Sequence, residues 1–205
     1  KLITSENQYK AVRNLGGELS WNNNVKLNKI NKNSIYHDIN IPDDIIKRDV
    51  CTMCAHVHYK NPKIIVGSLP VKNDKVLLCK RDIEPSRGRW TLPSGYMELG
   101  ESLEEGSKRE SLEEANLKYE IVKLYGTYSI PRIGQVLFIY LGKIMNDDYH
   151  AAAETSEVRL FQINEIPWEE IAFPSVDFFL KKYVEDYNDG NNFKFHTNYS
   201  ELIST

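Results

Sequence analysis

The chain has 205 residues, of which 41% are hydrophobic and 27% charged, and its formal net charge at pH 7 is −3. This length and apolar content suffice for one ordinary domain with extensions. No apolar run is long enough to cross a membrane, and the basic residues are scattered rather than clustered. We therefore expect neither a membrane nor a nucleic acid as a partner.

Three cysteines are too few for a disulfide framework, which favours a reducing intracellular compartment and a soluble protein. Because the chain begins at Lys1, an upstream targeting peptide could have been removed. The expected location is the cytosol or, after such processing, an organelle such as a plastid or mitochondrion. The sequence leaves a homodimer open.

The first part of the chain divides into two segments. Residues 1–38 are rich in Asn and Lys, which predicts a flexible leader. Residues 39–61 contain the pair Cys51 and Cys54, followed by His56 and His58. A structural zinc site needs four ligands, usually from two Cys-x-x-Cys pairs, and one short run would strain to surround the ion. This argues against structural zinc.

The main domain is expected over residues 62–187. Alternation and turn residues predict strands at 64–71 and 76–81, with Cys79 buried, and further strands near 119–125, 136–144 and 158–163. Val176, Phe179, Leu180 and Tyr183 recur at helical spacing, which predicts a last helix over about 175–185. Strands flanked by helices predict an α/β/α sandwich. Residues 188–205 return to polar composition and are expected to form a polar tail.

A helix with an acidic face lies between these strands. The run from Ser102 to Glu105 has the form of a capping box, so a helix should begin near Ser102. On it Glu110, Glu113 and Glu114 are spaced by three and four, which places three carboxylates on one face. Their mutual repulsion would be relieved by a hard cation, since Mg²⁺ and Mn²⁺ bind carboxylate oxygens. The alternative is a solvated helix in which Glu105 pairs with Arg109.

The spacing around this helix decides between these alternatives. Gly95, Glu101, the pair Arg109-Glu110 and the pair Glu113-Glu114 stand at fixed offsets. This pattern resembles the Nudix box of pyrophosphate hydrolases. The resemblance implies an α/β fold, specifically the Nudix α/β/α sandwich with a mixed sheet. The segment at 39–61 resembles the zinc-ribbon leader of one Nudix subgroup, in degenerate form, which would be a small N-terminal ribbon-like extension.

The resemblance also implies roles for these residues. Glu110, Glu113 and Glu114 would hold Mg²⁺ or Mn²⁺, with the Gly95 carbonyl as a further ligand, and Arg109 would pair with Glu101 to brace the loop. Two positions depart from the pattern. Ser111 replaces an aliphatic residue that usually packs the helix on the sheet, and Asn116 replaces the terminal glycine. Asn tolerates the left-handed conformation of a helix C-cap, so the second change is mild.

Further site residues are expected outside the box. Arg81 and Arg132 are candidates for binding the diphosphate, because a guanidinium suits bidentate phosphate contacts. Related enzymes bring another glutamate to the metals or use it as the base, and Glu154 and Glu157 are the candidates here. Each of these residues could instead be an ordinary surface charge.

Residues 61–185 resemble Nudix enzymes that hydrolyse FAD and ADP-ribose, on the runs Asn61-Pro62-Lys63, Trp90-Thr91-Leu92-Pro93 and Ile130-Pro131-Arg132 among others. The resemblance predicts a metal-dependent pyrophosphatase that cleaves a nucleoside diphosphate derivative into two monophosphates. NADH or another dinucleotide is an alternative substrate. The alternative of another class is a non-catalytic nucleotide sensor or scaffold, although a pure binder has no need of three repelling carboxylates.

Overall fold

The computed structural model describes residues 36–40, 44–51 and 56–201. The chain divides into two compact units, residues 1–61 and 62–205. Among the residues described, no helix is long and apolar enough to span a membrane.

The described part of the first unit is a small antiparallel sheet in the order β1-β2-β3. Its strands are β1 (Tyr36–Asn40), β2 (Lys47–Cys51) and β3 (Val57–His58). Ile39, Val50 and Val57 are buried in it, and so is Cys51, whose amide donates to the His56 carbonyl at 2.9 Å. Cys54 lies outside the described residues, so the expected absence of zinc at this cysteine pair stays a prediction.

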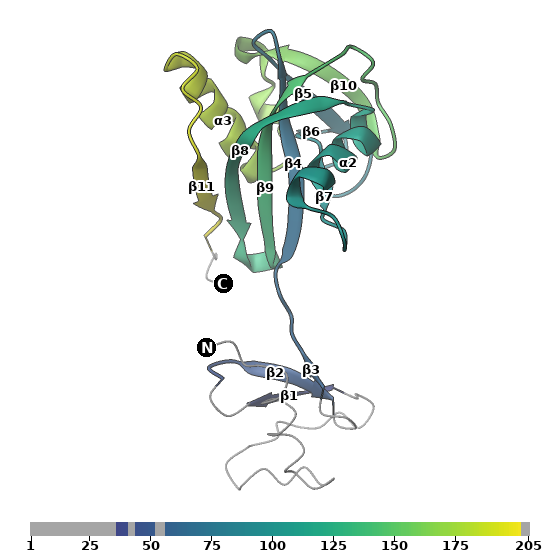
Figure 1. The fold of residues 1–205 in the computed structure, drawn as a ribbon, viewed down its shortest axis with the longest axis vertical. Helices are drawn as coiled ribbons and strands as arrows, with labels where there is room; N and C mark the ends of the chain where they lie inside the picture. Colours follow the sequence, from purple (N-terminus) through teal and green to yellow (C-terminus); the bar gives the residue numbers. More distant parts are fainter. Residues whose placement is uncertain (1–35, 41–43, 52–55, 202–205) are drawn as a thin grey trace, which may run out of the picture. The chain divides into compact units, whose positions relative to one another are not determined.

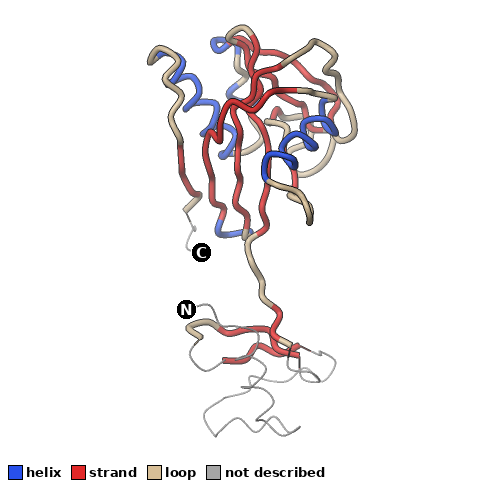
Figure 2. The backbone as a smooth tube through the Cα atoms, in the orientation of Figure 1, coloured by secondary structure: helices blue, strands red, loops and turns tan. Residues whose placement is uncertain are grey.

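The second unit is built on an eight-stranded sheet (Figures 1 and 2). Six strands follow the order β10-β5-β4-β9-β8-β11, while β6 pairs with β5 and β7 with β4. Their bounds are β4 (Lys63–Lys72), β5 (Lys75–Arg81), β6 (Trp90–Thr91), β7 (Ser94–Tyr96), β8 (Tyr119–Ile130), β9 (Gln135–Ile144), β10 (Thr155–Gln162) and β11 (His196–Tyr199). Parallel pairing of β4 with β9 and of β8 with β11, with antiparallel pairing elsewhere, confirms the mixed sheet.

Two α-helices cover opposite faces of this sheet, α2 (Leu103–Ala115) and α3 (Pro174–Asn188), with short 3₁₀ turns η1 (Pro131–Ile133), η2 (Ile163–Glu165) and η3 (Trp168–Glu170). Successive side chains of β5 point to opposite faces of the sheet and so identify which helix covers which face. Leu77 and Cys79 pack with Ala115 of α2, whereas Val76 and Leu78 belong to the core that includes Phe179 of α3. Cys79 is fully buried, as predicted from its strand.

The expected start and end of the acidic helix are confirmed. Ser102 is the N-cap, its hydroxyl accepts from the Glu105 amide, and the Glu105 carboxylate accepts from the Ser102 amide. Asn116 ends α2 in the left-handed conformation at φ 47°, as the tolerance of Asn for this conformation predicted. Its side-chain amide also donates to the Asp148 carbonyl at 3.1 Å, so the residue that replaces glycine ties the helix end to the next loop.

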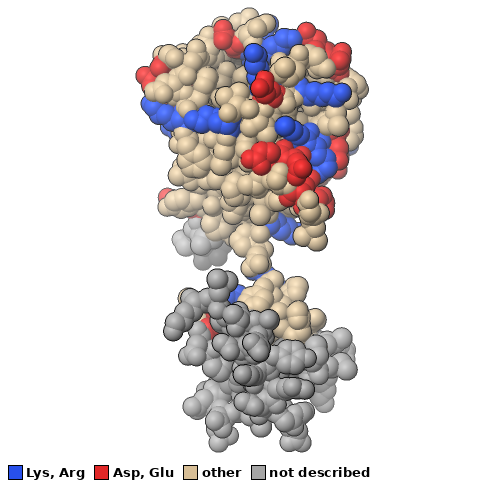
Figure 3. Space-filling view, in the orientation of Figure 1, with Lys and Arg blue, Asp and Glu red and all other residues tan. Residues whose placement is uncertain are grey.

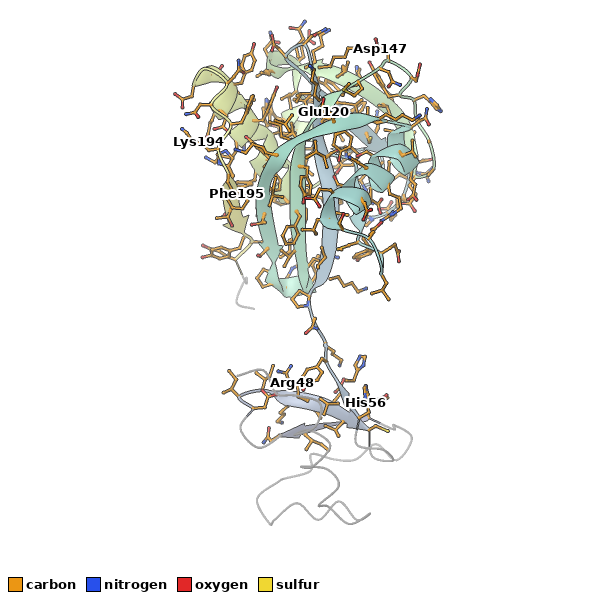
Figure 4. All side chains as sticks on the ribbon, in the orientation of Figure 1. Arg48, His56, Glu120, Asp147, Lys194 and Phe195 are labelled. Atoms are coloured by element: carbon orange, nitrogen blue, oxygen red, sulfur yellow. The ribbon has the colours of Figure 1, made fainter. Side chains whose placement is uncertain are left out.

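The C-terminal segment differs from the expected polar tail. His196–Tyr199 forms β11, which pairs with β8 along Gly126–Ser129. The buried carboxylate of Asp186 holds this strand against α3, accepting from Tyr125 Oη at 2.8 Å, from the Lys194 amide at 3.1 Å and sharing a 2.8 Å bond with His196 Nε2. Lys194 and Phe195 lead into the strand (Figure 4). Polar composition did not predict β11 because its contacts come from residues distant in sequence.

Candidate active site

The loop before α2 lies directly against the acidic face of the helix. Gly95 is in β7, which pairs with β4 between Ile65 and Gly67. A Cβ at Gly95 would collide with the Glu110 carboxylate, so any larger residue here would displace that carboxylate from the loop. The Ser94 amide donates to Glu114 at 3.3 Å. The sequence motif therefore places its glycine and two of its glutamates at one point.

Arg109 connects the loop to the helix. Its guanidinium makes a bidentate pair with Glu101, at 3.0 Å from Nε and 2.8 Å from Nη2, and Nη2 also donates to the Tyr96 carbonyl at 2.9 Å. Nη1 donates to Glu110 at 2.7 Å and to Glu113 at 3.1 Å. The alternative pairing of Arg109 with Glu105 is not what the structure has. Charged side chains of both signs gather over α2 (Figure 3).

The electrostatics of the carboxylates differ sharply. Hydrogen bonds from Arg109 and from the Glu98 amide lower the pKa of Glu101 to about 2. Burial raises the pKa of Glu114 to about 8, helped by the negative charge of Glu110 and opposed by the Ser94 amide. Burial also raises the pKa of Glu110, although Arg109 acts against it. Glu110 and Glu114 are thus two partly buried carboxylates whose ionised forms the surrounding protein groups do not fully stabilise.

Glu113 differs from these two. Its side chain is 54% exposed, against 12% for Glu110, and its carboxylate contacts Arg109. Within the described part of the chain, no three His, Cys, Asp or Glu side chains converge as a metal ion would require. The guanidinium of Arg109 donates to both Glu110 and Glu113.

The candidates outside the helix are not all near this group. Arg81 is the last residue of β5 and lies on the face covered by α2. Its positive charge lowers the pKa of Glu114, whereas the negative charge of Glu154 raises it. Arg81 and Glu154 therefore both lie close to the glutamates of α2. Arg132 is exposed in η1, at the turn between β8 and β9. Glu157 pairs across the sheet with Lys80, and both side chains lie on the opposite face from α2. The structure does not bring Glu157 to the site.

Residues 62–185 match the NUDIX domain family. The chain belongs to the Nudix family. One relative is the ADP-ribose pyrophosphatase of Methanocaldococcus jannaschii. The two proteins are 30% identical over 147 residues, which are 70% of this chain and 81% of the relative. This chain is 46% identical to the crystal structure of a NUDIX hydrolase from Nitrosomonas europaea, covering 78% of this chain and 90% of that one with a TM-score of 0.75. These relatives make the protein a Nudix hydrolase of the pyrophosphatase type.

A third relative is longer. The NAD-capped RNA hydrolase NudC of Vibrio atlanticus is 28% identical over 123 residues, which are 57% of this chain and 44% of that protein. This chain therefore spans less than half of that relative's length. The family match over residues 62–185 extends well beyond the box.

Some groups of this Nudix site could not be found by motif. The Ser94 amide, the Glu98 amide and the Tyr96 carbonyl each bond to a charged side chain of the box. Backbone groups carry no residue signature, and their only signal is the fixed spacing between Gly95 and Glu101. Sequence reasoning predicted the side chains and missed the backbone that holds them.

Proposed function

We propose that this Nudix hydrolase is a divalent-metal-dependent pyrophosphatase that acts on ADP-ribose or FAD. The observation that carries the proposal is the partly buried pair Glu110 and Glu114 against Gly95, with Arg109 and Glu101 bracing the loop. Two carboxylates whose pKa values are raised by burial and by neighbouring negative charges are suited to bind a cation.

The donors fit Mg²⁺ or Mn²⁺ in chemistry. Carboxylates of Glu110, Glu113 and Glu114 and the carbonyl of Gly95 are hard oxygen ligands, which these ions prefer. Glu113 would exchange its bond to Arg109 for the ion, and its exposure leaves it free to turn. When bound, the ion would neutralise the diphosphate and lower the pKa of a water. Binding the diphosphate and accepting the proton of the water are assigned to side chains of the protein.

Arg81 is the candidate to bind the diphosphate. Its Nε donates to the Pro85 carbonyl at 2.8 Å, and its guanidinium carbon lies 5.1 Å from the centroid of the Phe173 ring. These contacts fix the head group near Glu114 and leave further N–H donors for phosphate oxygens. Arg132 remains a second candidate on the basis of its exposure in η1.

Glu154 is the better candidate for a general base. Its carbonyl accepts from the Asp82 amide at 2.8 Å, which fixes the backbone next to Arg81, and its carboxylate is exposed near Glu114. Glu157 is engaged instead with Lys80 at 3.8 Å and Arg159 at 3.5 Å on the other face of the sheet. We therefore assign the base to Glu154 within this proposal.

ADP-ribose is the first substrate to test, because the relative from Methanocaldococcus jannaschii is an ADP-ribose pyrophosphatase. Water would attack one phosphorus, the bridging P–O bond would break, and ADP-ribose would yield AMP and ribose 5-phosphate. FAD would yield AMP and FMN by the same step. NADH, a dinucleotide with the same P–O–P bond, is the third substrate to compare.

The test is to separate AMP chromatographically after incubation of each nucleotide with Mg²⁺ or Mn²⁺. Wild type and Glu113→Gln are compared with Glu105→Gln, which lies on the same helix and keeps the form of the capping box. We expect AMP from ADP-ribose or FAD with wild type and Glu105→Gln, and a loss of at least about 100-fold with Glu113→Gln. Equal rates in all three proteins would contradict the proposed metal role, and no AMP from any nucleotide would favour a nucleotide sensor.

A further inference from the structure

Four hydroxyl groups lie between α2 and the sheet. They belong to Ser107 and Ser111 of α2, Ser68 of β4 and Tyr119 of β8, and we call them the hydroxyl cluster. The three serines are 0% exposed and Tyr119 is 7% exposed. Family pattern places an aliphatic residue where this chain has Ser111, so a polar contact stands where an apolar one would be expected. Buried polar groups are costly unless they are bonded to each other.

The bonds of the cluster form a connected path from sheet to helix. Ser111 Oγ donates to the Ser107 carbonyl at 2.8 Å. Because a serine hydroxyl has one hydrogen, Ser68 must be the donor in its 2.8 Å bond with Ser111 Oγ. A 2.6 Å bond joins Ser107 Oγ to Tyr119 Oη. The helix is therefore tied to β4 and to β8 by directional bonds.

Packing holds the cluster in place. A Cβ at Gly142 would collide with the Tyr119 ring, so that ring lies directly on β9 and its hydroxyl reaches the helix. On the helix side the buried positions are all small: Gly106, Ser107, Ser111 and Ala115. Because the buried side chains of the helix are short, α2 lies close to the sheet, and the serine bonds add directional contacts to the apolar packing of Leu77 and Cys79 against Ala115.

The serines lie one turn from the metal-binding carboxylates. Ser107 precedes Glu110 by three residues and Ser111 precedes Glu114 by three, which places each pair on neighbouring parts of the helix surface. A shift of α2 by one residue would move its side chains about 1.5 Å along the axis and turn them by about 100°. Apolar contacts tolerate small slides, whereas hydrogen bonds weaken steeply with misalignment.

We propose that Ser111 is a positioning residue for the metal site. With Ser68 as its partner, it fixes α2 on β4 so that Glu110 and Glu114 meet the Gly95 loop. This inference rests on the proposed function, because it assigns the reason for the geometry of the same site. Ser111 itself touches neither substrate nor ion.

The experiment measures Mn²⁺ binding to the full chain by isothermal titration calorimetry, with the free energy of unfolding measured in urea. The variants are Ser111→Ala, Ser68→Ala and their double mutant. Val176→Ala is the matched control, since it removes buried volume from the α3 core without touching the hydroxyl cluster. All titrations use a temperature at which each protein is folded by circular dichroism.

We expect the Mn²⁺ dissociation constant to rise about tenfold in Ser111→Ala, the lower end of the loss found when groups that orient metal ligands are removed. The double mutant should bind Mn²⁺ no more weakly than Ser111→Ala, because the Ser68–Ser111 bond is already lost in Ser111→Ala. Val176→Ala should lose stability and keep its Mn²⁺ affinity. Tyr119→Phe, which removes only a hydroxyl, should weaken binding less than Ser111→Ala.

Two results would overturn the inference, and they are distinguishable. Wild-type Mn²⁺ affinity in folded Ser111→Ala would overturn the positioning role alone and leave the proposed function standing. Equal losses of affinity in Ser111→Ala and Val176→Ala would also overturn it, because affinity would then follow stability. A wild type that binds no Mn²⁺ would overturn the proposed function and the inference together.

Discussion

Arg109 carries more bonds than any conservative replacement could reproduce. Its planar head group contacts Glu101 twice, the Tyr96 carbonyl, Glu110 and Glu113. A lysine keeps the charge but presents one nitrogen, so it cannot brace the loop and the helix together. We expect Arg109→Lys to lower the rate of ADP-ribose hydrolysis by at least about tenfold, measured as AMP formed per unit time.

The neighbouring position supplies the control for this substitution. Lys108→Arg makes the reverse exchange on an exposed part of the same helix and should leave the rate unchanged. If Arg109→Lys hydrolyses ADP-ribose as fast as the wild type, a point charge is enough and the bracing role is wrong.

The raised pKa of Glu114 predicts how the free energy of unfolding of the metal-free protein depends on pH. Its pKa is raised from 4.5 to about 8 by burial and by Glu110. Below pH 4.5 the Glu114 carboxyl is mostly neutral in both the folded and the unfolded chain. Between pH 4.5 and pH 8 it is mostly ionised in the unfolded chain but still mostly neutral in the folded one. The free energy of unfolding should therefore fall between about pH 4.5 and pH 8, by at most about 5 kcal/mol.

Urea denaturation in the presence of a chelator measures this change. Glu114→Gln removes the titrating group and should flatten the fall between pH 5 and pH 8, while Glu120→Gln, an exposed residue of β8, should not. A Glu114→Gln profile that still falls as steeply as the wild type would show that another group is responsible.

At single residues the sequence predicted the chemistry better than the placement. The pairing of Arg109 with Glu101 was implied by the resemblance to the Nudix box, whereas helical spacing alone favoured Glu105, and the left-handed Asn116 follows from the conformational tolerance of Asn. The face on which Glu157 lies does not, because the register of β10 on β5 depends on a bulge between Thr155 and Glu157. A shift of one residue in a strand exchanges the two faces, and no local pattern fixes it.

Among the elements, α2 was predictable because its signals are local. The capping box, the acidic spacing and the C-cap all lie between Ser102 and Asn116. β11 is the opposite case. It is a short polar strand that pairs with β8, far away in the sequence, and it is held in place by Asp186, which tertiary packing buries. Composition alone cannot show such a partner.

The attachment of β11 gives a prediction about stability. Asp186 is 3% exposed, and the bonds from His196, Tyr125 and the Lys194 amide lower its pKa against the effect of burial. Asp186→Asn cannot accept all of these bonds and removes the charge opposite His196. We expect the free energy of unfolding to fall by about 2–4 kcal/mol in urea denaturation at neutral pH.

A nearby aspartate provides the comparison. Asp189 pairs with Lys194 at 3.0 Å, but both side chains are more than half exposed. Asp189→Asn should therefore change the free energy of unfolding by less than about 0.5 kcal/mol. Comparable losses in the two variants would mean that the burial of Asp186 does not matter.

For the molecule as a whole, the mixed sheet with a helix on each face was predictable from alternating strands and helices together with the Nudix box. The order of strands was not, since β4 lies between β5 and β9 through pairing across about seventy residues. The two hydrophobic clusters on either face of β5 confirm why the sandwich forms: one strand supplies apolar side chains to both sides.

The division into two units leads to the last prediction. Every residue assigned to the site, from Arg81 to Glu154, and both hydrophobic clusters of the Nudix domain belong to residues 62–205. A fragment of residues 62–205 should therefore fold and hydrolyse ADP-ribose with the kcat/KM of the full chain. Circular dichroism establishes folding, and AMP release measures the rate. A folded fragment with a reduced kcat/KM would show that the first unit contributes to catalysis, whereas an unfolded one would show that it contributes to stability.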